Sequence, residues 1–76
     1  MPTEKEKLDK EMAEIAKPTG SEDPTVLSLE KLIETRKAEY DAAGTPELVL
    51  KLANQLRQLD TTRRARLHAI KDPEGE

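Results

Sequence analysis

Apolar residues recur along this chain with the period of an α-helix. Between residues 24 and 43, large apolar side chains fall every three or four positions and within roughly a third of the helical circumference. A second stripe begins after Pro46 and keeps its phase through Arg63 to Ile70. A weaker stripe, with only three large residues, occupies about residues 4 to 16. The pattern predicts an all-α protein.

Local signals mark where the first two helices begin. Thr3 and Glu6 form a T-x-x-E arrangement, in which side chains and backbone amides can cap each other at a helix start. Residues 18–23 are interpreted as a linker, because proline and glycine interrupt helical patterns. Asp23 before Pro24 is a strong start signal, since the carboxylate accepts free amide protons and proline suits the first helical position. The second helix is predicted to run to about residue 43.

The turn before the third helix is predicted to be very short. Gly44 can take the left-handed conformation that ends a helix. Immediately afterwards, Thr45, Pro46 and Glu47 supply a cap, a first-turn proline and a first-turn acid for the next helix. Stop and start signals this close together predict an antiparallel helical hairpin with an additional N-terminal helix.

The third helix contains one weak point, at Asp60-Thr61-Thr62, because aspartate and threonine compete for backbone hydrogen bonds. Two alternatives follow: a continuous helix to about Lys71, or a break near Thr61. In either case Pro73 is expected to end the helix.

The length of 76 residues leaves room for one domain. We divide it into an N-terminal amphipathic helix (1–17), a linker (18–23), the helical hairpin (24–71) and an acidic tail (72–76). Charged residues make up 38% of the chain, and the formal net charge is −3. No apolar run approaches the roughly 20 residues that cross a bilayer, and no secretory signal is recognised. With cysteine absent, these features predict a cytoplasmic protein.

The predicted hairpin carries more apolar surface than its two helices can hide from water. Eleven of the fifteen Leu, Ile and Val residues lie between Val26 and Leu59. An exposed strip of a few hundred Å² forgoes about 5 to 10 kcal/mol of burial. We therefore expect a homo-oligomer. The predicted contact residues are Val26, Leu29, Leu32, Ile33, Tyr40, Val49, Leu52, Leu56 and Leu59.

Two further features bear on this expectation. Leu27 and Leu50 point away from the apolar stripes and offer additional surface for a neighbour. The alternative to an oligomer is a monomeric three-helix bundle, in which Leu8, Met12 and Ile15 of the first helix cover the strip.

The residues that usually build a catalytic or metal site are scarce. His68 is the only histidine, Ser21 and Ser28 are the only serines, and cysteine is absent, so neither a Ser-His-Asp triad nor a His-rich metal site can form within one chain. The three glycines match no phosphate-binding motif. No concave apolar pocket is expected that would shift the pKa values of the acidic residues. The chain is predicted to be non-catalytic, with no cofactor.

One basic segment, residues 57–71, stands between acidic ones. Its cations are Arg57, Arg63, Arg64, Arg66 and Lys71. As a nucleic-acid site, the segment would contact DNA phosphates without reading sequence, and a ring of subunits would multiply the effect. The alternative is structural, with cations that complement the helix dipole and the acidic tail.

The stretch LIETRKAEYDAAGTPELVLKLANQLRQLD, residues 32–60, resembles the helical hairpin of small terminase subunits from tailed phages, especially phages of actinobacteria. The family's L-[AS]-x-Q-L-[RT] pattern is matched by Leu52, Ala53, Asn54, Gln55, Leu56 and Arg57. The resemblance implies a ring-forming, non-catalytic subunit in the host cytoplasm that engages phage DNA and hands it to a large ATPase subunit. This chain lacks the N-terminal helix-turn-helix domain of fuller members.

The same region is also similar to small aspartyl-phosphate phosphatases that act on sporulation response regulators. The matching residues are Ile33, Glu34, Val49, Leu50, Leu52 and Leu56. The chain departs from that family because an arginine follows Glu34 after two positions instead of three, and because Arg57 replaces the motif's aspartate. A plain protein-interaction module is the third hypothesis.

Overall fold

The computed structural model describes residues 3–71, with side chains through residue 69, and α-helix is the only regular secondary structure in this part of the chain. The helices are α1 (Glu4–Ile15), α2 (Pro24–Ala42) and α3 (Pro46–Lys71). The all-α prediction is confirmed. The predicted acidic tail, 72–76, lies outside the described residues.

Both predicted N-terminal caps are present. Thr3 Oγ1 accepts a hydrogen bond from the Glu6 amide at 3.1 Å, and Glu6 Oε1 accepts one from the Thr3 amide at 2.9 Å. At the start of α2, Asp23 Oδ2 accepts from the Val26 amide at 3.2 Å, and Pro24 occupies the first helical position. Each bond satisfies an amide that has no partner within its own helix.

The prediction that Gly44 adopts the left-handed conformation is wrong. Among the described residues, only Gly20 in the linker has a positive φ, of 80°. The chain leaves α2 through Ala43, which is extended (φ −63°, ψ 129°) and donates its amide to the Tyr40 carbonyl at 3.2 Å. An extended residue turns the chain without any need for glycine. Thr45 then caps α3 as predicted, with Oγ1 accepting from the Leu48 amide at 3.3 Å.

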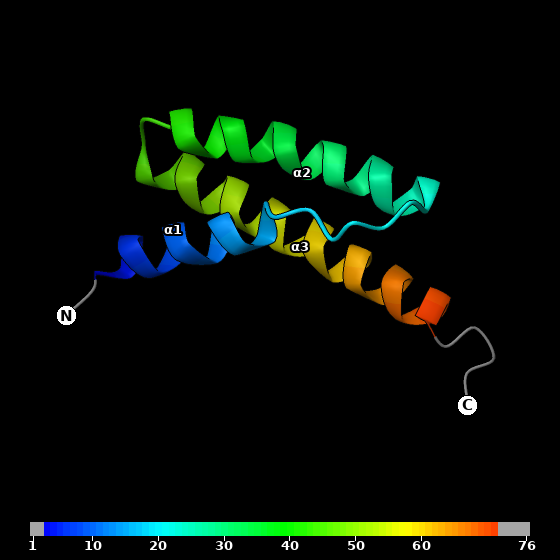
Figure 1. Ribbon diagram of the computed structural model, residues 1–76. Coiled ribbons are helices and arrows are strands. Elements are labelled where there is room, and N and C mark those ends of the chain that lie inside the picture. The colour runs from blue at the N-terminus through cyan, green and yellow to red at the C-terminus, as the bar shows by residue number, and fades with distance from the viewer. Residues whose placement is uncertain (1–2, 72–76) are drawn as a thin grey trace.

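α3 is continuous through Thr61, which decides between the two alternatives raised by the sequence. Thr62 Oγ1 donates to the Gln58 carbonyl at 3.0 Å, so its hydroxyl bonds back along the helix. The result is a 26-residue helix that extends beyond its contact with α1 (Figure 1).

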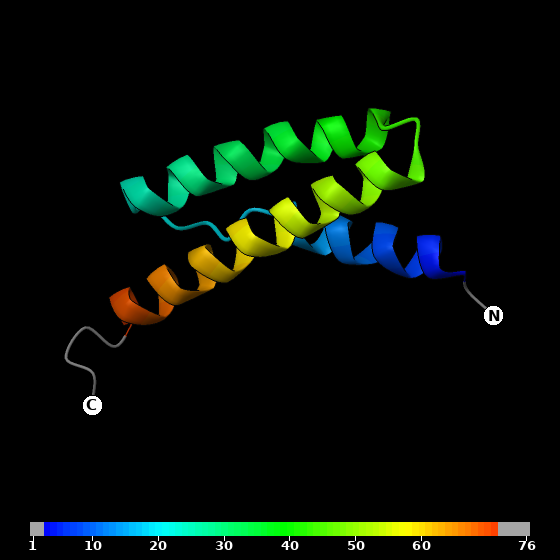
Figure 2. The ribbon, with the colours of Figure 1, turned by 180° about the vertical axis from the view of Figure 1, so that it is seen from behind.

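α2 and α3 lie side by side and are joined by residues 43–45, while α1 packs mainly against α3 (Figures 1 and 2). Apolar side chains from all three helices form the core. Its buried members are Met12, Ile15, Ile33, Tyr40, Leu52, Ala53 and Leu56. The first helix therefore contributes two of its three large apolar residues, and Leu8 packs at the edge of the core.

Part of the predicted contact surface between copies is corrected by this packing. Val26, Ile33, Tyr40, Leu52 and Leu56 are buried within the single chain, so in this fold they cannot face a second copy. Those that belong to the core are buried because α1 places Met12 and Ile15 against them. From the sequence, this apolar stripe of the hairpin was expected to be open. Of the remaining predicted residues, Leu29, Val49 and Leu59 are half-buried, and Leu32 is exposed.

A short hydrogen bond ties α1 to α2. Tyr40 Oη donates to Asp9 Oδ1 at 2.5 Å, and the ammonium groups of Lys5 and Lys37 lie 6.0 and 5.9 Å from the centre of the Tyr40 ring. Burial, and then the bond to Asp9, raise the pKa of the Tyr40 phenol. The same bond is the main reason why the pKa of Asp9 is below its ordinary value.

Candidate functional site

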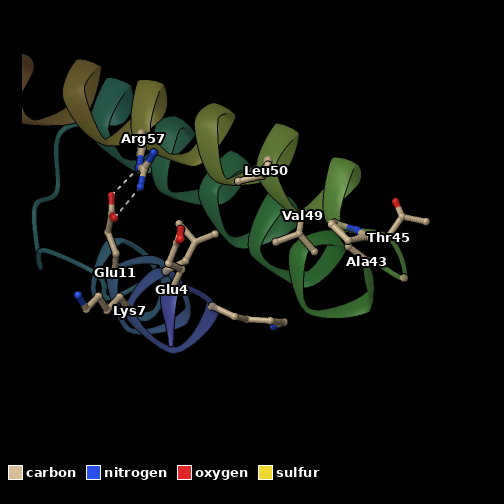
Figure 3. A pocket seen from close by; sticks show the side chains of 12 residues that line it. Glu4, Lys7, Glu11, Ala43, Thr45, Val49, Leu50 and Arg57 are labelled. Atoms are coloured by element: carbon tan, nitrogen blue, oxygen red, sulfur yellow. Dashed lines mark hydrogen bonds and ion pairs between the residues drawn. The ribbon is translucent and has the colours of Figure 1, made fainter. Parts of the chain in front are cut away.

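The basic segment, residues 57–71, is the DNA contact predicted from the sequence. In the structure, Arg57 of this segment is hydrogen-bonded to α1. Its Nε and Nη2 donate to the two carboxylate oxygens of Glu11, at 2.7 and 2.9 Å (Figure 3). Both side chains are about half exposed, and the hydrogen bonds from Arg57 lower the pKa of Glu11. This bidentate pair connects two residues that are far apart in the sequence and holds α1 against α3.

Arg63 is buried, with 4% of its surface exposed. Its Nη2 donates to the Ile15 carbonyl at 2.9 Å and to Asp60 Oδ1 at 2.7 Å. Its Nη1 donates to the Lys17 carbonyl at 3.3 Å and to Glu30 Oε2 at 3.4 Å. The guanidinium thus satisfies carbonyls at the C-terminal end of α1, which have no amide partner of their own. The expectation that Arg63 touches DNA is corrected, because no phosphate can reach it in this fold.

The other arginines of the segment are paired at the surface. Arg66 donates through Nε and Nη2 to both oxygens of Asp23, at 3.2 and 3.1 Å, and the hydrogen bonds from Arg66 are the main cause of a lowered pKa at Asp23. Arg64 Nε lies 2.9 Å from Asp60 Oδ2, although 77% of the Arg64 side chain is exposed. The side chain of Lys71 lies outside the described residues. DNA contact by Arg57, Arg64, Arg66 and Lys71 stays a prediction.

A groove separates the first half of α1 from the start of α3 (Figure 3). Its volume is about 590 Å³. Both apolar and charged side chains line it. The apolar lining consists of Leu8, Ala43, Pro46, Val49 and Leu50. The expectation that no concave apolar pocket forms is therefore wrong. The spacing of residues along each helix did not predict the groove, because the groove arises where α1 diverges from α3 toward the N-terminus of α1 (Figure 1).

A smaller hollow of about 320 Å³ lies between α2 and α3. We call this surface the outer face and define it by the lining residues Leu32, Arg36, Gln55, Gln58, Leu59 and Thr62. Leu32 is 47% exposed there. Gln55 Oε1 is buried, and no described group donates a hydrogen bond to it. Leu32 and Leu59 belong to the self-association surface predicted from sequence, whereas the unpaired amide oxygen had no sequence signal.

His68 is exposed on α3, as expected for a solvated residue. Within residues 3–71, no group of three or more His, Cys, Asp or Glu side chains is placed to hold a metal ion. In the same part of the chain, no helix combines the length and the apolar composition that spanning a bilayer requires. Comparisons with protein-family models, curated proteins and solved structures found no match.

The carboxyl groups bound by Tyr40, Arg57 and Arg66 predict an acid-sensitive fold. The pKa values of Asp9, Glu11 and Asp23 are lowered from the ordinary 3.8 for Asp and 4.5 for Glu. A carboxyl group with a lower pKa in the folded chain stabilises the fold above its ordinary pKa, and this contribution is lost as the pH falls through the lowered value. We expect the urea midpoint, followed by circular dichroism, to be constant from about pH 7 to 5 and to fall by about pH 3.

Tyr40→Phe is the matched control for this acid effect. The variant removes the main cause of the lowered pKa at Asp9, so its urea midpoint should decrease less between about pH 5 and 3 than that of the wild type. An unchanged wild-type midpoint across this range would contradict the prediction.

Proposed function

We propose that this chain is a non-catalytic helical adaptor that acts through contacts with protein surfaces, including those of its own copies. The observation that supports the proposal is the exposure of large aliphatic side chains around a core that is already closed. Their exposed fractions are 50% for Leu27, 47% for Leu32, 43% for Leu48 and 57% for Leu50. Leu50 lines the groove beside α1, and Leu32 lines the outer face.

The energetic argument concerns what a partner would remove from water. Burial of apolar surface contributes about 25 cal/mol per Å², so covering a large aliphatic side chain contributes about 1.5 to 3 kcal/mol relative to full exposure. The intramolecular core leaves these leucines uncovered, and a small helical protein has few other sources of stability. Contact with a partner surface therefore stabilises the folded chain as well as the complex.

The solution mass tests the self-association part of this proposal. Over a concentration range of about 10 to 500 μM, we expect light scattering to give a mass that exceeds the 8.5 kDa of one chain and rises with concentration or reaches a fixed multiple. The fraction of associated chains follows mass action, so dilution should reverse the increase. A constant mass of one chain at every concentration would refute self-association.

A DNA-packaging role of the small-terminase type places a further demand on the basic segment. Arg57 and Arg66 would have to exchange Glu11 and Asp23 for phosphates, since each is held by two hydrogen bonds to its carboxylate. Arg64 is the more accessible arginine, because most of its side chain faces solvent. The geometry therefore supports protein contact more directly than DNA contact.

A further inference from the structure

The α2–α3 hairpin presents a binding site for a helix, and the N-terminal segment, residues 3–17, occupies it. Leu8, Met12 and Ile15 pack on the hairpin at spacings of four and three residues, the pattern with which an amphipathic helix fills an apolar groove. The apolar floor of the site consists of Ile33, Tyr40, Leu52, Ala53 and Leu56.

The hydrogen bonds of this site all run in one direction. Tyr40 donates to Asp9, and Arg57 donates twice to Glu11. Arg63 donates to two carbonyls at the C-terminal end of the N-terminal segment. Within the described residues, every hydrogen bond between this segment and the hairpin therefore has its donor on the hairpin. The site is complementary to an amphipathic helix that carries carboxylates beside its apolar stripe and ends at Arg63.

A second copy of this chain carries a helix with this chemistry. Its α1 offers the same three apolar side chains, the same two carboxylates and the same carbonyl end. Every contact of the site can therefore form between copies as well as within one, and no donor of the site is left unpaired. Exchange of an identical element between copies is a low-cost route to a dimer for this reason.

The linker provides a hinge at Gly20. α1 ends near the middle of α3, and the linker runs from there to the start of α2 (Figure 1). Gly20 has a φ of 80°, and glycine reaches both signs of φ at no steric cost, so this residue can redirect the chain. Thr19, just before the hinge, donates through its amide and hydroxyl to Glu30 at 2.9 and 2.6 Å. The segment up to Thr19 can therefore move as a unit to the hairpin of another copy.

The linker also determines when a second copy can compete. A short flexible tether keeps a segment at an effective concentration of about 1 mM near its site, so exchange grows as the chain concentration approaches this value. A free 12-residue helix is marginal in water, so an α1 that leaves its own hairpin is stabilised by binding to another. The exchanged fraction therefore rises with concentration and decreases again on dilution.

We propose that two copies of this chain exchange their N-terminal segments, so that α1 of each copy packs on the α2–α3 hairpin of the other. This inference rests on the proposed adaptor function and specifies the partner and the surface of its self-association. The contacts of Met12, Ile15, Asp9 and Glu11 with the hairpin then become contacts between copies.

Complementary charge reversals at the Arg57–Glu11 pair test the exchange. Glu11→Arg leaves two cations at this contact and Arg57→Glu leaves two anions, so each variant weakens the docking of its own α1. In an equimolar mixture of the two variants, an exchanged dimer brings opposite charges together at both of its sites. Sedimentation velocity should show dimers in the mixture with a dissociation constant at least about tenfold below that of either variant alone.

Arg36 and Glu39 provide the matched control, because they form an ion pair of similar exposure within α2. A mixture of Arg36→Glu and Glu39→Arg contains the same two kinds of substitution and therefore the same net charges. Neither residue contacts α1 through this pair, so exchange of α1 cannot restore it. The dimer dissociation constant of the control mixture should differ from those of its separate components by less than about twofold.

Circular dichroism of the same samples completes the test. Any helix content that Glu11→Arg or Arg57→Glu loses alone should be regained in their mixture. A mixture whose mass and helix content equal the mean of its components, or that dimerises no more tightly than the control mixture, would overturn the exchange and leave the adaptor proposal standing. A wild-type chain that remains a single copy at every concentration would overturn the exchange and self-association together.

Discussion

Replacing Arg63 by alanine is expected to lower the free energy of unfolding by about 3 kcal/mol, because removal of one partner from a buried ionic network leaves uncompensated groups behind. In the folded chain the guanidinium binds two backbone carbonyls at the end of α1, those of Ile15 and Lys17. It also binds the carboxylates of Asp60 and Glu30, whose side chains are only 12% and 14% exposed. In the variant, Asp60 keeps its ion pair with Arg64 and Glu30 keeps its bonds to Thr19. The carbonyls of Ile15 and Lys17 lose the donor that Arg63 provides.

Arg64→Ala is the matched control for this prediction. Arg64 is the next residue on α3 and binds the same carboxylate, Asp60, but its side chain faces solvent. Exposed ion pairs contribute about 0 to 1 kcal/mol, so this variant should unfold within about 1 kcal/mol of the wild type. Urea unfolding followed by circular dichroism measures both values. Equal destabilisation by the two substitutions would show that the buried network is not the source of the effect.

Arg63 also shows which structural facts the sequence contains. The helical phase of the third helix places position 63 on the apolar stripe, and this was a sign that its side chain points inward. Asp60, three residues earlier, is a local partner, but the other three could not be read in the same way, because Ile15, Lys17 and Glu30 are 33 to 48 residues away. A basic segment was visible, but its neutralisation depends on how α1 and the linker fold back over α3.

Helix ends were more predictable than surfaces, because caps depend on neighbouring residues. The side chains of Thr3, Asp23 and Thr45 each accept a hydrogen bond from the amide three residues ahead, so the local sequence is enough to predict these caps. The mistaken conformation at Gly44 has the opposite cause, since an extended Ala43 ends α2 equally well. The groove beside α1 depends on the angle between two helices, and spacing along one helix does not specify that angle.

Replacing Met12 by alanine is expected to release α1 from the rest of the fold. Met12 is fully buried among core residues of α2 and α3, and loss of a buried methionine side chain costs about 2 to 5 kcal/mol. A free 12-residue helix is marginal in water, so the packing of Met12 and Ile15, together with the Tyr40–Asp9 and Arg57–Glu11 bonds, holds α1 in place.

Hydrogen exchange can follow this release residue by residue. A loss of about 3 kcal/mol corresponds to exchange about a hundredfold faster at the α1 amides, where 1.4 kcal/mol is a factor of ten. Leu27→Ala is the control, because Leu27 is half exposed and its truncation should leave α1 protection unchanged. Unchanged protection of α1 in Met12→Ala would contradict the prediction. Release of α1 would also uncover Ile33, Leu52 and Leu56, so stronger self-association of Met12→Ala would locate a second contact surface beneath α1.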